Sequence, residues 1–162
     1  MTEKEMFLHF WEAEFPVTRK VFAAYPADQL DFKPHPVSRA ARDLMWTVVS
    51  EEIGFVDGVV AGKIDFSNLP KVPDTLEVIL KDYDRIHQEM VSKVKKMSDA
   101  DFNATIKFYV APKTLGDIRK AQGLWMMLMD QVHHRGQMTV YLRMTGGKVP
   151  SIYGPSADEP WQ

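Results

Sequence analysis

Four polar side chains recur along one apolar segment near the end of the chain, at a spacing suited to ligand binding. They follow one another at intervals of four, three and four residues: Asp130, His134, Gln137 and Tyr141. Because an α-helix has about 3.6 residues per turn, this spacing places all four on one continuous stripe. A carboxylate and an imidazole on the same stripe can bind one metal ion or one small ligand.

A second polar pair, Thr47 and Glu51, is separated by four residues in another segment of helical periodicity. With Asp130 and His134, this pair completes our set of candidate metal ligands. One imidazole and two carboxylates can bind zinc, manganese or iron, and an open coordination position would lower the pKa of a bound water or thiol. The alternative is structural, namely a buried hydrogen bond between Asp130 and His134 that compensates for burying both groups. His133 lies about 100° around the helix and is not a candidate ligand.

Four long helices are predicted to position these side chains. The apolar periodicity predicts them over residues 3–24, with Pro16 as a candidate kink, over 38–62, over 74–97, and from 114 to a stop at Gly146–Gly147. Prolines over 25–36 and 63–73 predict connecting loops. The β-branched and aromatic residues over 105–110 predict a short extended segment or hairpin before the last helix. The expected fold is therefore all-α, an up-down four-helix bundle in one domain spanning residues 1–162.

The composition excludes several classes of function. The 20 basic and 22 acidic residues give a net charge of −2, so binding to nucleic acid is not expected. The chain has no cysteine, which excludes disulfides, thiolate zinc sites and a cysteine nucleophile, so that any thiol must come from a substrate. Charged residues interrupt the N-terminal apolar positions, unlike in a signal peptide or a membrane span. We therefore expect a cytoplasmic protein with no membrane partner.

Two segments of the last third resemble the closing signature of the DinB-like family of small metal-binding bundles, also described as DinB/YfiT-like. They are His133–Met144, which reads HHRGQMTVYLRM, and Pro150–Pro155, which reads PSIYGP. Leu30–Pro34 and Arg39–Leu44 also read as features of this family. The similarity therefore extends over most of the chain.

The resemblance implies a four-helix bundle, a homodimer, and a divalent metal such as nickel or zinc that three histidines hold in many members. It also implies thiol-dependent S-transferase or isomerase chemistry with a low-molecular-weight thiol. His134 matches one of the family's ligand histidines. Asp130 and Thr47 occupy the positions where the other two are usual. The expected cofactor is therefore a divalent ion (nickel, zinc or manganese) in a site of altered ligands.

Two functional hypotheses follow from this pattern. The first is a metal-dependent enzyme, a thiol-dependent S-transferase or a hydrolase, with Asp130 and His134 as ligands and Glu51 or Thr47 completing the site. The second is a metal-free bundle that binds a small ligand, or that dimerises as a stress-related protein. Retention of an acid on each inner helix face favours the first hypothesis, whereas the loss of ligand histidines favours the second.

Overall fold

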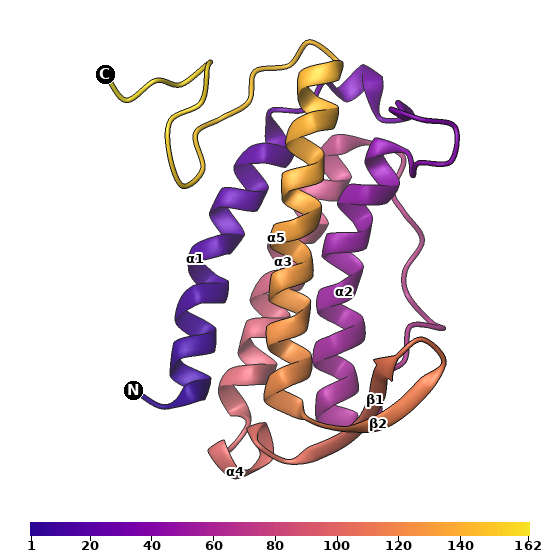
Figure 1. The fold of residues 1–162 in the computed structure, drawn as a ribbon, viewed down its shortest axis with the longest axis vertical. Helices are drawn as coiled ribbons and strands as arrows, with labels where there is room; N and C mark the ends of the chain where they lie inside the picture. Colours follow the sequence, from indigo (N-terminus) through magenta and orange to yellow (C-terminus); the bar gives the residue numbers. More distant parts are fainter.

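The computed structural model describes residues 1–162, and four long helices run side by side along its length (Figure 1). These helices are α1 (Glu3–Ala23), α2 (Ala41–Ala61), α3 (Leu76–Lys96) and α5 (Lys120–Met144). Both α1 and α2 pack against α3 and against α5. The short elements are the 3-10 helix η1 (Ala27–Gln29), the helix α4 (Asp99–Phe102), and the strands β1 (Thr105–Ala111) and β2 (Thr114–Arg119). The fold is thus mostly helical, as predicted, with five α-helices and a small sheet.

Local signals at the helix ends explain most of these boundaries. The side chain of Thr2 accepts from the Glu5 amide while the Glu5 carboxylate accepts from the Thr2 amide, which is a capping box at the start of α1. Thr75 caps α3 through its side chain. Gly62 ends α2 with a φ of 82°, a left-handed conformation that glycine adopts without strain. Pro16 lies inside α1, which continues to Ala23.

The start of the last helix was predicted incorrectly. Residues 114–117 do not begin a helix but belong to β2, which pairs with β1 in an antiparallel hairpin, and α5 starts only at Lys120. The pairing brings Ile106 opposite Ile118, and both side chains are buried. Because successive residues of a strand face opposite sides, one face of this hairpin can cover the ends of the helices. The expected extended segment over 105–110 is confirmed, and the fold is not purely all-α.

The interior forms one connected cluster of 34 buried hydrophobic residues drawn from every long helix. The loop after α2 closes over this helix at two glycines. A Cβ at Gly54 would lie 2.5 Å from the ring of Phe66, and a Cβ at Gly58 would lie 2.5 Å from the Cα of Ile64. Glycine at both positions therefore allows this loop to pack on α2. None of the helices is long and apolar enough to span a membrane.

The segment after α5 is held against the helices by a buried arginine. Arg135 is almost fully buried, and its guanidinium pairs with Glu14 of α1 and donates to the hydroxyl groups of Thr18 and Tyr153. The guanidinium carbon of Arg135 also lies 5.1 Å from the centre of the Tyr153 ring. The signature segments around Arg135 and Tyr153 therefore contact each other in the fold.

Candidate metal centre

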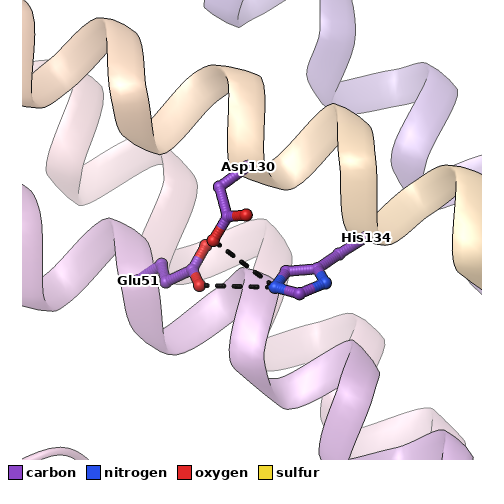
Figure 2. A group of neighbouring side chains, drawn as sticks. All are labelled: Glu51, Asp130 and His134. Carbon is purple, nitrogen blue, oxygen red and sulfur yellow. Dashed lines mark ion pairs between the residues drawn. The ribbon is translucent and has the colours of Figure 1, made fainter. Parts of the chain in front are cut away.

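Three of the candidate ligands meet between α2 and α5. Glu51 projects from α2, while Asp130 and His134 project from successive turns of α5 toward it (Figure 2). The Nε2 atom of His134 lies 3.4 Å from Oδ2 of Asp130 and 3.7 Å from Oε1 of Glu51. One ligand atom from each residue lies within 4.8 Å of the other two. This separation is suited to a shared cation, because ligand atoms at about 2.0–2.2 Å from one ion lie less than 4.5 Å apart.

The three side chains differ in their access to solvent. Glu51 and His134 expose only 12% and 13% of their side-chain surface, whereas Asp130 exposes 48%. The group therefore has a closed inner side and an open side at Asp130. A centre of this shape leaves room for a water molecule or a substrate atom to approach from the Asp130 side.

The imidazole of His134 is oriented by a neighbour on the next turn. Its Nδ1 lies 2.8 Å from Oε1 of Gln137. An amide oxygen only accepts hydrogen bonds, so Nδ1 carries the proton and Nε2 presents its lone pair to the two carboxylates. A histidine whose second nitrogen is held in this way is typical of metal ligands.

Glu51 is buried with an unsatisfied oxygen. Its Oε2 is the one buried side-chain nitrogen or oxygen in the chain that has no hydrogen-bond partner. Burial is the main cause that raises the pKa of Glu51 to about 9, followed by the nearby carboxyl group of Asp130, while the charge of Arg39 opposes the rise. Without a cation, this carboxyl group therefore keeps its proton at neutral pH.

Thr47, the fourth candidate, has other partners. Its hydroxyl donates to the carbonyl oxygen of Asp43 at 2.9 Å and accepts from Nη1 of Arg39 at 2.8 Å. Thr47 is not one of the three residues whose ligand atoms converge. Tyr141, the last residue of the polar stripe, donates to the carbonyl oxygen of Arg39 at 3.1 Å.

His133 is not one of the three residues whose ligand atoms converge. It lines a shallow groove with Phe55, Met126, Met129 and Asp130, and its ring centre lies 5.3 Å from that of His134. That His133 shares no ion with His134 stays a prediction.

A second polar cluster, which the sequence analysis missed, includes the residues that directly follow Glu51 and Asp130 in the chain. Glu52 is fully buried, and its Oε1 accepts from the indole nitrogen of Trp11 at 3.1 Å and from the side-chain amide of Gln131 at 3.2 Å. Nδ1 of His87 lies 3.1 Å from the same oxygen. The ring of His87 also stacks on Phe15, with 4.0 Å between ring centres. This cluster joins all four long helices.

Only part of this cluster has a signal in the sequence. Glu52 and Gln131 directly follow Glu51 and Asp130, so each could be placed one residue around its helix from a candidate ligand. Trp11 and His87 come from two other helices and share no spacing with them. Because Gln131 also donates to the carbonyl oxygen of Val48 at 3.1 Å, the cluster fixes α2 against α5 and thereby positions Glu51 opposite Asp130.

A polar hollow of about 310 Å³ adjoins the metal group on the side of His134. Its walls come from the segment before α2, from the first turn of α2 and from the second half of α5, and they comprise Ser38, Arg39, Leu44, His134, Gln137 and Tyr141. His134 belongs both to this hollow and to the group of candidate ligands. A molecule bound in the hollow would therefore lie next to the three candidate ligands.

Known proteins are similar to this chain in sequence and in fold. The chain is 26% identical over 160 residues to the uncharacterized protein YrdA of Bacillus subtilis, and the match covers 94% of this chain and 89% of YrdA. A DinB-like protein from Bacillus cereus superposes with a TM-score of 0.77 at 24% identity, covering 92% of this chain and 97% of that protein.

The DinB-like protein YjoA of Bacillus subtilis superposes with a TM-score of 0.74 at 17% identity, covering 91% of this chain and 97% of YjoA. At these identities, the two structures establish a shared fold. The family model for the DinB family matches residues 1–162, which is the whole chain. The chain therefore belongs to the DinB family.

Proposed function

We propose that this protein is a metal-dependent enzyme whose divalent ion is held by Glu51, Asp130 and His134. The observation that carries this proposal is the buried Oε2 of Glu51, which has no partner although it belongs to a group of three converging ligands. A buried carboxylate without a partner is costly, and a cation is the partner that this group lacks. The raised pKa of Glu51 supports the same conclusion, because burial, its main cause, and the nearby charge of Asp130 both disfavour an ionised Glu51 that has no cation beside it.

The donor atoms indicate which ions fit. One imidazole nitrogen and two carboxylate oxygens suit zinc and manganese, and nickel accepts the same donors. When bound, such an ion lowers the pKa of a coordinated water or thiol, so that a hydroxide or thiolate forms near neutral pH. Gln137 contributes by holding Nε2 of His134 toward the site, and the exposed side of Asp130 leaves an entrance.

The proposed reaction is a thiol-dependent S-transfer or a hydrolysis. Membership of the DinB family supports the first, since the sequence resembles members that use a low-molecular-weight thiol. The chain has no cysteine, so its thiol would have to be a substrate. The polar hollow beside His134 is the space in which that substrate would bind.

Metal titration of tag-free protein tests this proposal. Isothermal titration calorimetry with zinc, manganese and nickel is expected to show one site per chain for at least one ion, and His134→Ala is expected to abolish it. His133→Ala is the matched control, because His133 is the adjacent histidine but is not one of the three residues whose ligand atoms converge. Equal affinity in wild type and His134→Ala, or no binding of any of the three ions to the wild type, would contradict the proposal.

A metal-free role is the second candidate. A protonated Glu51 that hydrogen-bonds to Asp130 gives the group a stable arrangement without an ion. A groove of about 300 Å³ between α1 and α5, lined mainly by Phe10, Trp125, Leu128 and Met129, would then receive a small apolar ligand. The same calorimetric titrations separate the two roles, because this one predicts no stoichiometric metal.

A further inference from the structure

Arg39 is the one arginine of the chain that has no acidic partner. Six of the seven arginines form ion pairs with aspartate or glutamate side chains: Arg19, Arg42, Arg85, Arg119, Arg135 and Arg143. Arg39 forms none, although it lies near enough to Glu51 to lower the pKa of that carboxyl group. Its charge is thus available to a ligand.

Two contacts hold Arg39 in place without using its whole guanidinium. Nη1 donates to the hydroxyl of Thr47 at 2.8 Å, and the carbonyl oxygen of Arg39 accepts from the hydroxyl of Tyr141 at 3.1 Å. Nε and Nη2 donate to no protein atom, so one edge of the guanidinium keeps both of its donors. This pair of parallel donors matches the two oxygens of a carboxylate.

The charges around Arg39 also favour an anion. Arg39 lines the polar hollow together with His134 and Gln137, next to the carboxylates of Glu51 and Asp130. A divalent cation on these two carboxylates would balance them, leaving the positive charge of Arg39 uncompensated. A negatively charged ligand in the hollow would restore neutrality beside the exposed side chain of Arg39.

We propose that Arg39 binds the carboxylate of a small-molecule substrate in this hollow and thereby holds the reacting end of that molecule at the metal. This inference rests on the proposed metal centre. It also assigns a role to Thr47, whose hydroxyl positions the guanidinium of Arg39 instead of binding the ion.

The experiment compares two thiols on the cobalt-substituted protein. Cobalt bands in the visible spectrum report the metal site, and the thiolate-to-cobalt charge-transfer band in the near ultraviolet reports thiol binding. The probes are 3-mercaptopropionate and 3-mercaptopropanol, which share their chain length but differ in the carboxylate. The wild type is expected to bind 3-mercaptopropionate about tenfold more tightly, and Arg39→Met is expected to lose this preference.

Arg42→Met is the matched control, since Arg42 lies on the first turn of α2 but pairs with Asp31 at 2.8 Å outside the hollow. It is expected to keep the preference. Equal affinity of the wild type for both thiols, or an unchanged preference in Arg39→Met, would overturn the assignment of Arg39 while leaving the metal centre intact. Absence of the cobalt bands would overturn the metal centre and, with it, this inference.

A third probe separates a carboxylate from a tetrahedral anion. The sulfonate of 2-mercaptoethanesulfonate also carries one negative charge but is not planar. We expect Arg39 to increase the affinity for this probe less than it increases the affinity for 3-mercaptopropionate. A larger increase for the sulfonate would overturn the choice of a carboxylate.

Discussion

Glu51 is a carboxyl group that the fold buries beside a second carboxyl group. Its Oε2 has no partner, and its neighbour Asp130 carries the same sign of charge when both are ionised. In the metal-free protein a proton relieves this conflict, which is why the pKa is raised to about 9. A cation would also relieve this conflict. Protons and metal ions therefore compete for Glu51, and metal affinity should fall with decreasing pH.

Replacing Glu51 by glutamine should remove a pH dependence from the stability of the metal-free protein. The pKa of Glu51 is about 9 in the folded state against an ordinary value of 4.5, so the folded state holds the proton more tightly. Its contribution to stability is complete below pH 4.5 and is lost as the pH rises through 9. On going from pH 5 to pH 9, the free energy of unfolding of Glu51→Gln should therefore rise by about 1–3 kcal/mol relative to that of the wild type.

Urea denaturation in the presence of EDTA at both pH values measures this difference. Glu77→Gln, at an exposed position in the first turn of α3, serves as the control and should change little between the two pH values. If the wild type and Glu51→Gln lost equal stability between pH 5 and pH 9, this account of Glu51 would be refuted.

At the scale of elements, the metal group depends on how α2 faces α5. Neither helix alone brings a third ligand to Asp130 and His134, and the contact between them sets where Glu51 lies. Glu52 and Gln131 join the two helices one residue away from the ligands, and Trp11 and His87 tie the same point to α1 and α3. Buried polar clusters of this kind favour a single alignment of the helices when every member has a partner.

Removing the side chain of Glu52, the central residue of this polar cluster, should destabilise the fold strongly. Glu52→Ala leaves the indole of Trp11, the imidazole of His87 and the amide of Gln131 without their shared acceptor inside the protein. We expect a loss of about 2–5 kcal/mol in the free energy of unfolding, measured by urea denaturation. Glu12→Ala removes an exposed ion pair with Lys95 and should cost less than about 1 kcal/mol. Similar losses in both variants would show that the cluster is not structural.

The boundary between β2 and α5 was not predicted correctly from the sequence. Residues 114–119 contain a threonine, a glycine and an acidic residue before a long helix, which is also how a helix can begin. The strand is explained by its pairing with β1, in which Lys107 lies opposite Asp117 and Ile106 opposite Ile118. Such cross-strand pairs stabilise only residues that a turn has already brought together, so a pattern read along one segment does not reveal them.

At the scale of the whole molecule, the helices enclose one continuous core while the metal group lies between two helices near the surface. Occupation of this group by an ion should therefore stabilise the complete fold rather than one segment. The single domain, the homodimer and the cytoplasmic location stay predictions from the sequence.

Saturating metal should raise the melting temperature of the protein. A ligand that binds only the folded state adds about 2.7 kcal/mol of stability at a free concentration one hundred times its Kd. For a chain of this size, that corresponds to a rise on the order of 5–10 °C. Differential scanning calorimetry should show this rise in the wild type and in His133→Ala but not in His134→Ala. A rise of the same size in His134→Ala would exclude His134 as a ligand.

Relations within a single helix could be predicted from the order of its residues. The polar stripe of Asp130, His134 and Gln137 follows from the helical period, because residues three and four apart share a face whatever the rest of the chain does. The placement of Glu51 on the inner face of its own helix follows in the same way. The family resemblance, carried by contiguous motifs, was also evident from the sequence and is confirmed.

Relations between helices, in contrast, became evident only from how the helices pack in the fold. Glu51 rather than Thr47 meets the stripe of α5, Thr47 instead supports Arg39, and Glu52 gathers partners from three other helices. The physical reason is that the rotation and the offset of one helix against another are set by the packing of all their side chains together. A shift of one residue would exchange Glu51 for Glu52 at the interface, and no spacing within a single helix records which of the two meets Asp130 and His134.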